Sequence, residues 1–137
     1  MKVYVMMFGI ANIVAGGPIY CANKIKYLES NGWKVVVFPT DSGKIYIKPL
    51  EKYNGNDYSF LHYSPYILGR HKSNKFIKKM SSKIPRSKNI IIETGTDYTA
   101  LWGELLAKQI NARHIVMFLD EKNEKVNRYS APFYDFK

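Results

Sequence analysis

Residues 3–8 read VYVMMF and residues 16–18 read GGP, and these two short stretches decide the fold. The nearly continuous apolar run at 3–8 is typical of a β-strand that is buried on both faces of a parallel sheet. Proline suits the first turn of a helix, so Gly16-Gly17-Pro18 predicts a loop that ends where a helix begins. This order of strand, glycine loop and helix predicts the opening unit of a Rossmann-like α/β domain.

The helix and a second strand follow directly. Cys21, Ala22, Ile25 and Leu28 recur at helical spacing, and Asn31-Gly32 predicts the end of the helix. Residues 35–38 are a second short apolar run and therefore a second buried strand. A parallel crossover of this kind is almost always right-handed.

The rest of the chain continues the same alternation after an irregular stretch. Turn residues interrupt residues 39–69, where we expect a short strand at 44–47 and long connections. The later elements are a helix at 72–83, a strand at 89–92, a helix at 97–110 and a strand at 114–119. The sequence thus predicts an α/β fold, a Rossmann-like parallel sheet flanked by helices, formed by residues 1–137 as a single domain.

Charge and cysteine content narrow the function classes. The chain has 21 Lys and Arg against 11 Asp and Glu, a formal charge of +10, which favours partners that carry phosphate. The single cysteine excludes an internal disulfide, and no His lies at metal-ligand or catalytic-triad spacing, so we expect neither metal nor cofactor.

Tyr4 and Asn12 interrupt the first apolar run, which favours a strand over a signal peptide. We expect a cytoplasmic protein, with any membrane contact peripheral.

The glycine pair is the leading candidate site. Ligands bind open α/β sheets at the carboxyl ends of the strands, and this loop follows the first strand. Gly16 and Gly17 lack the Cβ that would keep a ligand from the backbone, and the free N–H groups of a helix N-terminus favour a phosphate. A tight turn explains one glycine, whereas the second exceeds that need. We therefore expect a phosphate-bearing ligand here.

Other polar residues follow the predicted strands at the same edge. Gly95 and Thr96 face this edge, while Asp97 is expected to cap the next helix. Asp41 suits a ribose in such a fold, but capping or turning the chain before Ser42-Gly43 is the favoured interpretation. The remaining candidate acceptor or cleft contacts are Asn12, Tyr20, Asp120 and Glu121. For the acidic pair Asp120-Glu121, orienting a substrate hydroxyl and simple solvation are equally favoured interpretations.

A basic surface is expected on the helix at 72–83 and in the connection after it. Residues 58–92 contain no acidic side chain, which is more one-sided than solvation requires. A basic amphipathic helix is typical of contact with an anionic membrane, with a solvated face and a nucleic-acid surface as alternatives. No nucleic-acid-binding motif accompanies this helix. The basic surface consists of Arg70, Lys72, Lys75, Lys78, Lys79, Lys83, Arg86 and Lys88.

Several of these stretches together resemble the family 4 retaining glycosyltransferases. That family opens with a strand, G-G-x, a helix carrying a leucine, and x-G-H-x-V, and Trp33 stands here where the motif has His. The second half of the family's domain has a strand, a helix ending near L-A and a short strand. The matching stretches are residues 3–8, 16–18 with Tyr20, Leu28, 31–35, 89–92, 106–108 and 112–116.

The resemblance implies a GT-B architecture, in which two Rossmann-like domains face each other across a cleft. Residues 1–137 would be the amino-terminal, acceptor-side domain, with Gly16 and Gly17 at the diphosphate of a nucleotide-sugar donor. A glycan or lipid-linked acceptor in cell-surface polysaccharide synthesis would receive the sugar. The donor-binding carboxyl-terminal domain has no counterpart in this chain, so the chain alone is expected to be inactive. No catalytic residue is assigned, because residues 118–121 lack the family's histidine near the reaction centre.

Two other function classes remain open. A Rossmann-type nucleotide-binding module, an oxidoreductase or a sensor, would place Asp41 on a ribose, although the loop at 9–17 is longer than a G-x-G-x-x-G turn. A nucleic-acid-binding protein would use the basic helix.

Overall fold

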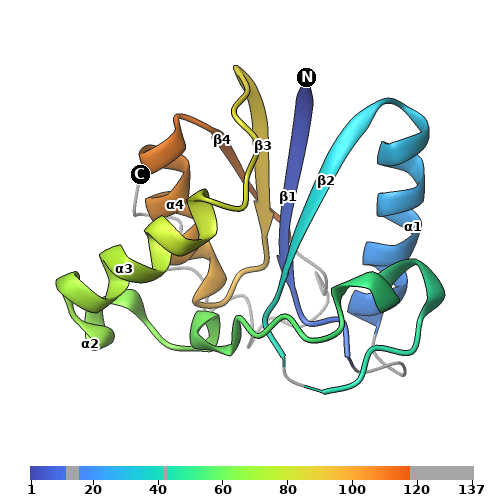
Figure 1. The fold of residues 1–137 in the computed structure, drawn as a ribbon. Helices are drawn as coiled ribbons and strands as arrows, with labels where there is room; N and C mark the ends of the chain where they lie inside the picture. The colour runs from blue at the N-terminus through green and yellow to red at the C-terminus, as the bar shows by residue number, and fades with distance from the viewer. Residues whose placement is uncertain (12–15, 42, 118–137) are drawn as a thin grey trace.

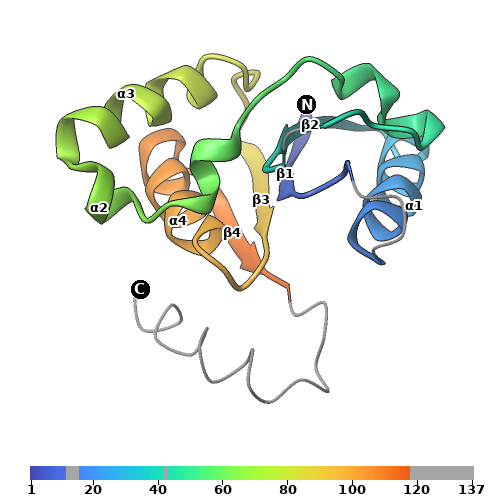
Figure 2. The same cartoon turned by 90° about the horizontal axis from the view of Figure 1, so that it is seen from below.

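Four parallel strands form one sheet with helices on both of its faces. The computed structural model describes residues 1–11, 16–41 and 43–117. The strands are β1 (Lys2–Phe8), β2 (Trp33–Pro39), β3 (Asn89–Thr94) and β4 (Arg113–Val116), in the order β2-β1-β3-β4. Helix α1 (Gly16–Ser30) covers one face, and α3 (Arg70–Ser81) and α4 (Thr99–Ile110) cover the other (Figures 1 and 2). The predicted Rossmann-like α/β fold is confirmed.

The order of the strands reverses between β1 and β3. Strand β1 pairs with both β2 and β3, and all three pairings in the sheet are parallel. Helix α1 connects β1 to β2 across one face, whereas α4 connects β3 to β4 across the other. In open α/β sheets such a reversal opens a crevice at the carboxyl ends of the strands, where ligands bind. Figure 2 views the sheet from this end.

The apolar run at 3–8 is continuous because β1 is buried on both faces. Val3, Val5 and Met7 belong to the core cluster that includes residues of α3 and α4, such as Met80 and Trp102. Tyr4, Met6 and Phe8 belong to the second cluster, which α1 supplies with Cys21, Ile25 and Leu28. Alternate side chains of one central strand therefore anchor both helical layers.

Helix α1 begins earlier than the sequence predicts. Gly16 and Gly17 are its first two residues, so the glycine pair lies in the first helical turn and not in the preceding loop. The helix ends at Ser30, and Gly32 adopts a positive φ of 83° that turns the chain toward β2. The predicted end at Asn31-Gly32 is confirmed.

The strand expected at 44–47 does not form. Both backbone polar groups of Ile45 bond to one side chain, because its N–H donates to Asn54 Oδ1 at 2.8 Å and its carbonyl accepts from Asn54 Nδ2 at 3.2 Å. Asn54 thereby takes the place of a neighbouring strand. This part of the chain instead forms 3₁₀-helices, η1 (Lys48–Tyr53) and η2 (Ser59–His62), and the short α-helix α2 (Pro65–Leu68).

The later elements form at the predicted places with shifted ends. Helix α3 begins and ends two residues earlier than expected, and α4 begins at Thr99. Strand β4 begins one residue earlier than predicted and ends at Val116, close to the limit of the described residues. Among the described helices, none combines the length and apolar character that crossing a bilayer would need.

Gly103 lets α4 pack closely on the sheet, and this yields a stability test. A Cβ at Gly103 would lie 2.6 Å from both His114 Nε2 and Thr94 Cγ2, whereas one at Gly17 would lie 3.6 Å from the Gly9 carbonyl oxygen. We expect Gly103→Ala to lower the free energy of unfolding by about 1–3 kcal/mol, although alanine favours a helix. Urea unfolding measures this, with Gly17→Ala as the helical control that keeps or gains stability. Equal losses in both variants would contradict the packing argument.

Candidate functional site

The carboxyl edge brings together the ends of β1 and β3 and the start of α1. The position of a Cβ at Gly17 is 3.6 Å from the Gly9 carbonyl oxygen, directly after β1. The corresponding position at Gly95, directly after β3, is 3.9 Å from Phe8 Cε1 at the end of β1. The structure thus places the glycine pair and Gly95 beside the same end of the central strand, where the strand order reverses.

Neither Gly17 nor Gly95 is required by the fold. The described glycines with positive φ are Gly32, Gly43, Gly55 and Gly69, so the backbone at 17 and 95 is open to any residue. A Cβ would make only ordinary contacts, at 3.6 Å for Gly17 and at 3.7 Å from Asp97 Oδ1 for Gly95. Two positions at this edge therefore lack a side chain without a structural reason, so no Cβ keeps a ligand from the backbone there.

Asp41 holds the start of the loop after β1. Its Oδ1 accepts the N–H of Ile10 at 2.9 Å, and its Oδ2 accepts the N–H of Ala11 at 3.0 Å. A carboxylate that accepts two amides in this way is held in one orientation. Asp41 therefore joins the ends of β1 and β2, where the sequence predicted a cap or turn before Ser42-Gly43.

Asp97 bonds to the first residue of α4, close to its predicted capping role, although Tyr98 stands at the N-cap position. Asp97 Oδ1 accepts the N–H of Thr99 at 3.0 Å, and Thr99 Oγ1 in turn accepts the N–H of Gly95 at 3.2 Å. Thr96 is half-buried in the same loop. The candidates Asn12, Asp120 and Glu121 lie outside the described residues.

A buried carboxylate that the sequence did not single out lies under α1. Glu93 of β3 has no exposed surface. Its Oε2 accepts a hydrogen bond from the Tyr20 hydroxyl at 2.9 Å. Its Oε1 accepts one from the Tyr4 hydroxyl and forms an ion pair with Lys24 Nζ. Lys24 Nζ also donates to Tyr20 at 3.0 Å and lies 4.9 Å from the centroid of the Tyr4 ring. We call Tyr4, Tyr20, Lys24 and Glu93 the Glu93 cluster.

Burial and mutual contact shift the pKa values of the side chains in this cluster. Burial, reinforced by Glu93, raises the pKa of Tyr4 and of Tyr20 above the usual range, so both hydroxyls stay protonated and donate. Burial alone would lower the pKa of Lys24, but hydrogen bonds with Glu93, Tyr4 and Tyr20 raise it instead. Burial also raises the pKa of the neighbouring Cys21 thiol to about 12, so this thiol stays unreactive.

The Glu93 cluster is internally satisfied. Both carboxylate oxygens accept from protein donors, and Tyr20, expected as a cleft contact, uses its hydroxyl on Glu93 instead. The cluster therefore fastens α1 to β1 and β3. Its signal in the sequence was an acid at the end of an apolar strand, with Tyr20 and Lys24 one helical turn apart.

A second polar network lies on the opposite face of β3. His114 Nε2 is 2.8 Å from Thr94 Oγ1, and its Nδ1 is 3.3 Å from Glu104 Oε2. Hydroxyl, imidazole and carboxylate follow one another as in a catalytic triad, although the sequence predicted no such context for any histidine. Thr94 has no exposed surface and Gly103 of α4 packs on it, so a substrate has no access. The network fastens α4 to the sheet.

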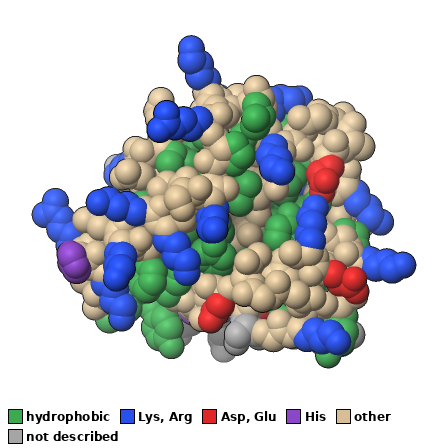
Figure 3. Space-filling model, viewed as in Figure 1, with side chains coloured by type: hydrophobic (Ala, Val, Ile, Leu, Met, Phe, Trp, Pro, Cys, Tyr) green, Lys and Arg blue, Asp and Glu red, His purple; other side chains and the backbone are tan. Residues whose placement is uncertain are grey.

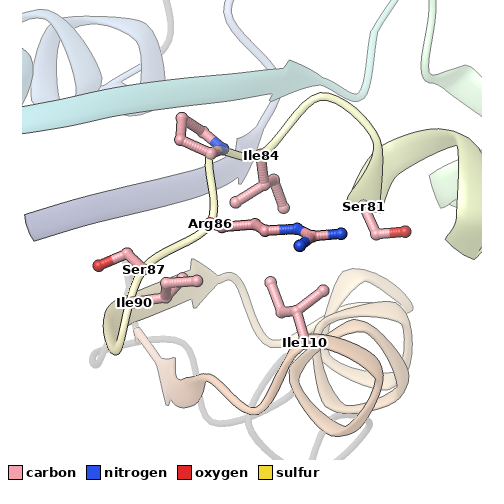
Figure 4. A pocket seen from close by; sticks show the side chains of 7 residues that line it. Ser81, Ile84, Arg86, Ser87, Ile90 and Ile110 are labelled. Atoms are coloured by element: carbon pink, nitrogen blue, oxygen red, sulfur yellow. The ribbon is translucent and has the colours of Figure 1, made fainter. Parts of the chain in front are cut away.

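A hollow lies at the other end of the sheet. It has a volume of about 270 Å³ between the end of α3, the start of β3 and the end of α4. Ile84, Ile90 and Ile110 form its apolar wall, and the Arg86 guanidinium extends across it (Figure 4). The carboxyl ends of the two helices favour a cation at this place. Arg86 therefore covers apolar surface far from the glycine pair.

The predicted basic surface is exposed. All eight of its side chains are exposed, and none forms an ion pair with a described carboxylate. Figure 3 shows Lys and Arg side chains spread over the α3 side, with few acidic ones among them. Within the described ranges, no group of His, Cys, Asp and Glu could hold a metal ion.

Removing Lys24 should leave the Glu93 carboxylate buried without its cation. We expect Lys24→Met to lower the free energy of unfolding by about 3 kcal/mol, because an uncompensated buried charge is costly. The double variant Lys24→Met/Glu93→Gln should recover at least half of this loss. Chemical unfolding measures both, and Lys26→Met, at an exposed position of α1, should change stability little. A double variant as unstable as the single one would contradict the ion-pair role.

His114 should make the fold less stable in mild acid. Burial lowers its pKa in the folded chain, so the unfolded chain takes up a proton first as the pH falls through about 6.5. Stability contributed by the neutral ring is present above this pH and is lost below it. His114→Gln should therefore lose less stability between pH 7.5 and 5.0 than the wild type does. As the control, His71→Gln, which changes an exposed histidine of α3, should lose as much stability as the wild type. An unchanged slope in His114→Gln would rule this linkage out.

Comparison with known proteins adds no identity to these observations. No family model, no curated protein and no solved structure matches the chain. What the chain shows by itself is an α/β domain with a four-stranded parallel sheet, in which Gly17 and Gly95 lie beside the end of β1 where the strand order reverses.

Proposed function

We propose that this chain is the acceptor-side domain of a glycosyltransferase that moves a sugar from a nucleotide-sugar donor to a glycan or lipid-linked acceptor. The observation that carries the proposal is the pair of structurally unnecessary glycines, Gly17 and Gly95, which lie beside the end of β1 where the strand order reverses. The doubly wound sheet and the resemblance of its motifs to the family 4 retaining glycosyltransferases support the same assignment.

In this proposal the backbone at the start of α1 stabilises the departing diphosphate. The N–H groups of Gly16, Gly17 and Ile19 have no partner earlier in the helix, and they carry the positive end of its dipole. Fixed N–H dipoles stabilise negative charge that develops in a transition state, without reorganising as the bond breaks. The absence of a side chain at Gly17 lets a diphosphate approach them. The nucleoside of the donor would be held mainly by a second domain, as the resemblance implies.

The alternative is a nucleotide-binding oxidoreductase or sensor, and the hydrogen-bond partners of Asp41 bear on it. In that class an acidic residue near the end of the second strand binds a ribose hydroxyl. Both oxygens of Asp41 accept backbone amides of Ile10 and Ala11 instead. This use of Asp41 favours the transferase.

The basic surface supports a peripheral contact with the anionic inner face of a membrane. Each cation near such a surface contributes on the order of 1 kcal/mol. The eight exposed cations have no carboxylate partner among the described residues, so their charge is available to a membrane. A lipid-linked acceptor would be met at this surface.

The glycine pair can be tested with inorganic pyrophosphate. We expect pyrophosphate to shift the backbone amide NMR signals of Gly17, Ile19, Tyr20 and residues 95–97, with a millimolar dissociation constant. Gly17→Ala should weaken this binding by about fivefold or more, because its Cβ stands between the ligand and the N–H groups, while the fold stays as stable as the wild type.

The matched control is Lys26→Gln, which removes an exposed charge from the same helix and should leave pyrophosphate binding within about twofold. Uridine diphosphate should bind no more than a few times tighter than pyrophosphate. Micromolar binding of an intact nucleotide sugar to the chain would favour an independent nucleotide-binding module instead. Unchanged binding by Gly17→Ala would remove the glycine pair from the proposal.

A further inference from the structure

The turn between η2 and α3 presents a small apolar surface that the sequence pattern does not predict. Ile67 is 79% exposed, and Tyr63 and Tyr66 are 61% and 62% exposed. All three lie within or next to the four-residue helix α2, and Gly69, with φ of 89°, turns the chain directly into α3. We call Tyr63, Tyr66 and Ile67 the α2 corner. Figure 3 shows hydrophobic side chains at the lower left, where Figure 1 places α2.

The backbone of the α2 corner is fixed to the rest of the fold. Trp102 of α4, which has no exposed surface, donates its Nε1–H to the Tyr63 carbonyl at 2.8 Å. Ser73 of α3 donates its hydroxyl to the Pro65 carbonyl at 2.6 Å, and Ser64 caps α2 by accepting the N–H of Tyr66. These bonds fix the backbone of the corner, at which Tyr63, Tyr66 and Ile67 are exposed.

Positive charge surrounds this corner. Arg70, Lys72 and Lys75 follow it on α3, all exposed and without a described carboxylate partner. Exposed aliphatic and tyrosine side chains beside a basic helix are typical of segments that lie in the interface of an anionic bilayer. A nucleic acid would use the cations and could stack on the tyrosines, but it gives Ile67 nothing to bury against. The combination therefore favours a lipid surface.

We propose that the α2 corner inserts into the headgroup region of an anionic bilayer, with Ile67 deepest, while α3 lies along the surface. The inference rests on the membrane contact proposed above and specifies which side chains enter the lipid. In Figure 1 α2 lies at the end of the molecule toward which the strands point. A membrane at this corner would therefore lie beside the edge that carries Gly17 and Gly95, where a lipid-linked acceptor is needed.

Vesicle binding separates insertion from attraction by charge. The full chain should sediment with vesicles of 30% phosphatidylglycerol in phosphatidylcholine and not with phosphatidylcholine alone. Ile67→Ser should weaken this partitioning by about fivefold or more, whereas Ile19→Ser, at an isoleucine of α1 that is 53% exposed, should not. Lys72→Gln/Lys75→Gln should weaken it by about twentyfold, and Lys26→Gln/Lys48→Gln, at exposed positions of α1 and of η1 beside it, much less.

A fluorescence measurement reads the depth directly. Tyr66→Trp should be quenched by brominated lipids in anionic vesicles more strongly than the wild type, whose Trp102 is buried and Trp33 half-buried. If the lysine variants lose binding while Ile67→Ser and Tyr66→Trp match the wild type, the membrane contact stands and the insertion is overturned. If anionic vesicles are not bound at all, or a single-stranded oligonucleotide displaces them at equal phosphate concentration, the membrane contact itself is overturned.

Discussion

The buried Glu93 carboxylate is the constraint on which the arrangement of α1 depends. A carboxylate without exposed surface is costly unless its oxygens are paired and hydrogen-bonded. Tyr4 of β1 and Tyr20 and Lys24 of α1 satisfy this requirement. The two helical residues are one turn apart, so both reach Glu93 only when one face of α1 is turned toward β3. The same orientation sets the first turn of α1, with Gly17, against the end of β1.

Adjacent residues of β3 serve the two faces of the sheet. Glu93 points under α1, while Thr94 points under α4 and meets His114, which in turn meets Glu104. Both networks are closed, the first by its own tyrosines and lysine and the second by the close approach of Gly103. The polar side chains most like catalytic groups are therefore used for packing. The carboxyl edge then offers the start of α1, where Gly17 has no side chain over the helical N–H groups, which suits a ligand held through its negative charge.

Much of the fold was predictable because hydrophobic periodicity reports burial directly. The run at 3–8, the helical spacing from Cys21 to Leu28 and the apolar stripe of α3 each predicted an element that formed. The strand expected at 44–47 failed because Asn54, nine residues beyond Ile45, supplies the hydrogen bonds that a strand would need. Periodicity shows which side chains are apolar, but it does not show which polar side chain will satisfy the backbone.

By itself, the sequence determined the succession of the four strands and of α1, α3 and α4 along the chain, the two-sided burial of β1, the glycines at the carboxyl edge and the basic character of α3. These properties follow from local patterns of residue type, which act over one strand or a few helical turns. Only the tertiary structure decided that Glu93 meets Tyr20 and Lys24, that His114 lies between Thr94 and Glu104, and that Ile67 projects beside the basic helix. Each of these depends on residues distant in the chain, whose approach is set by how the helices pack on the sheet.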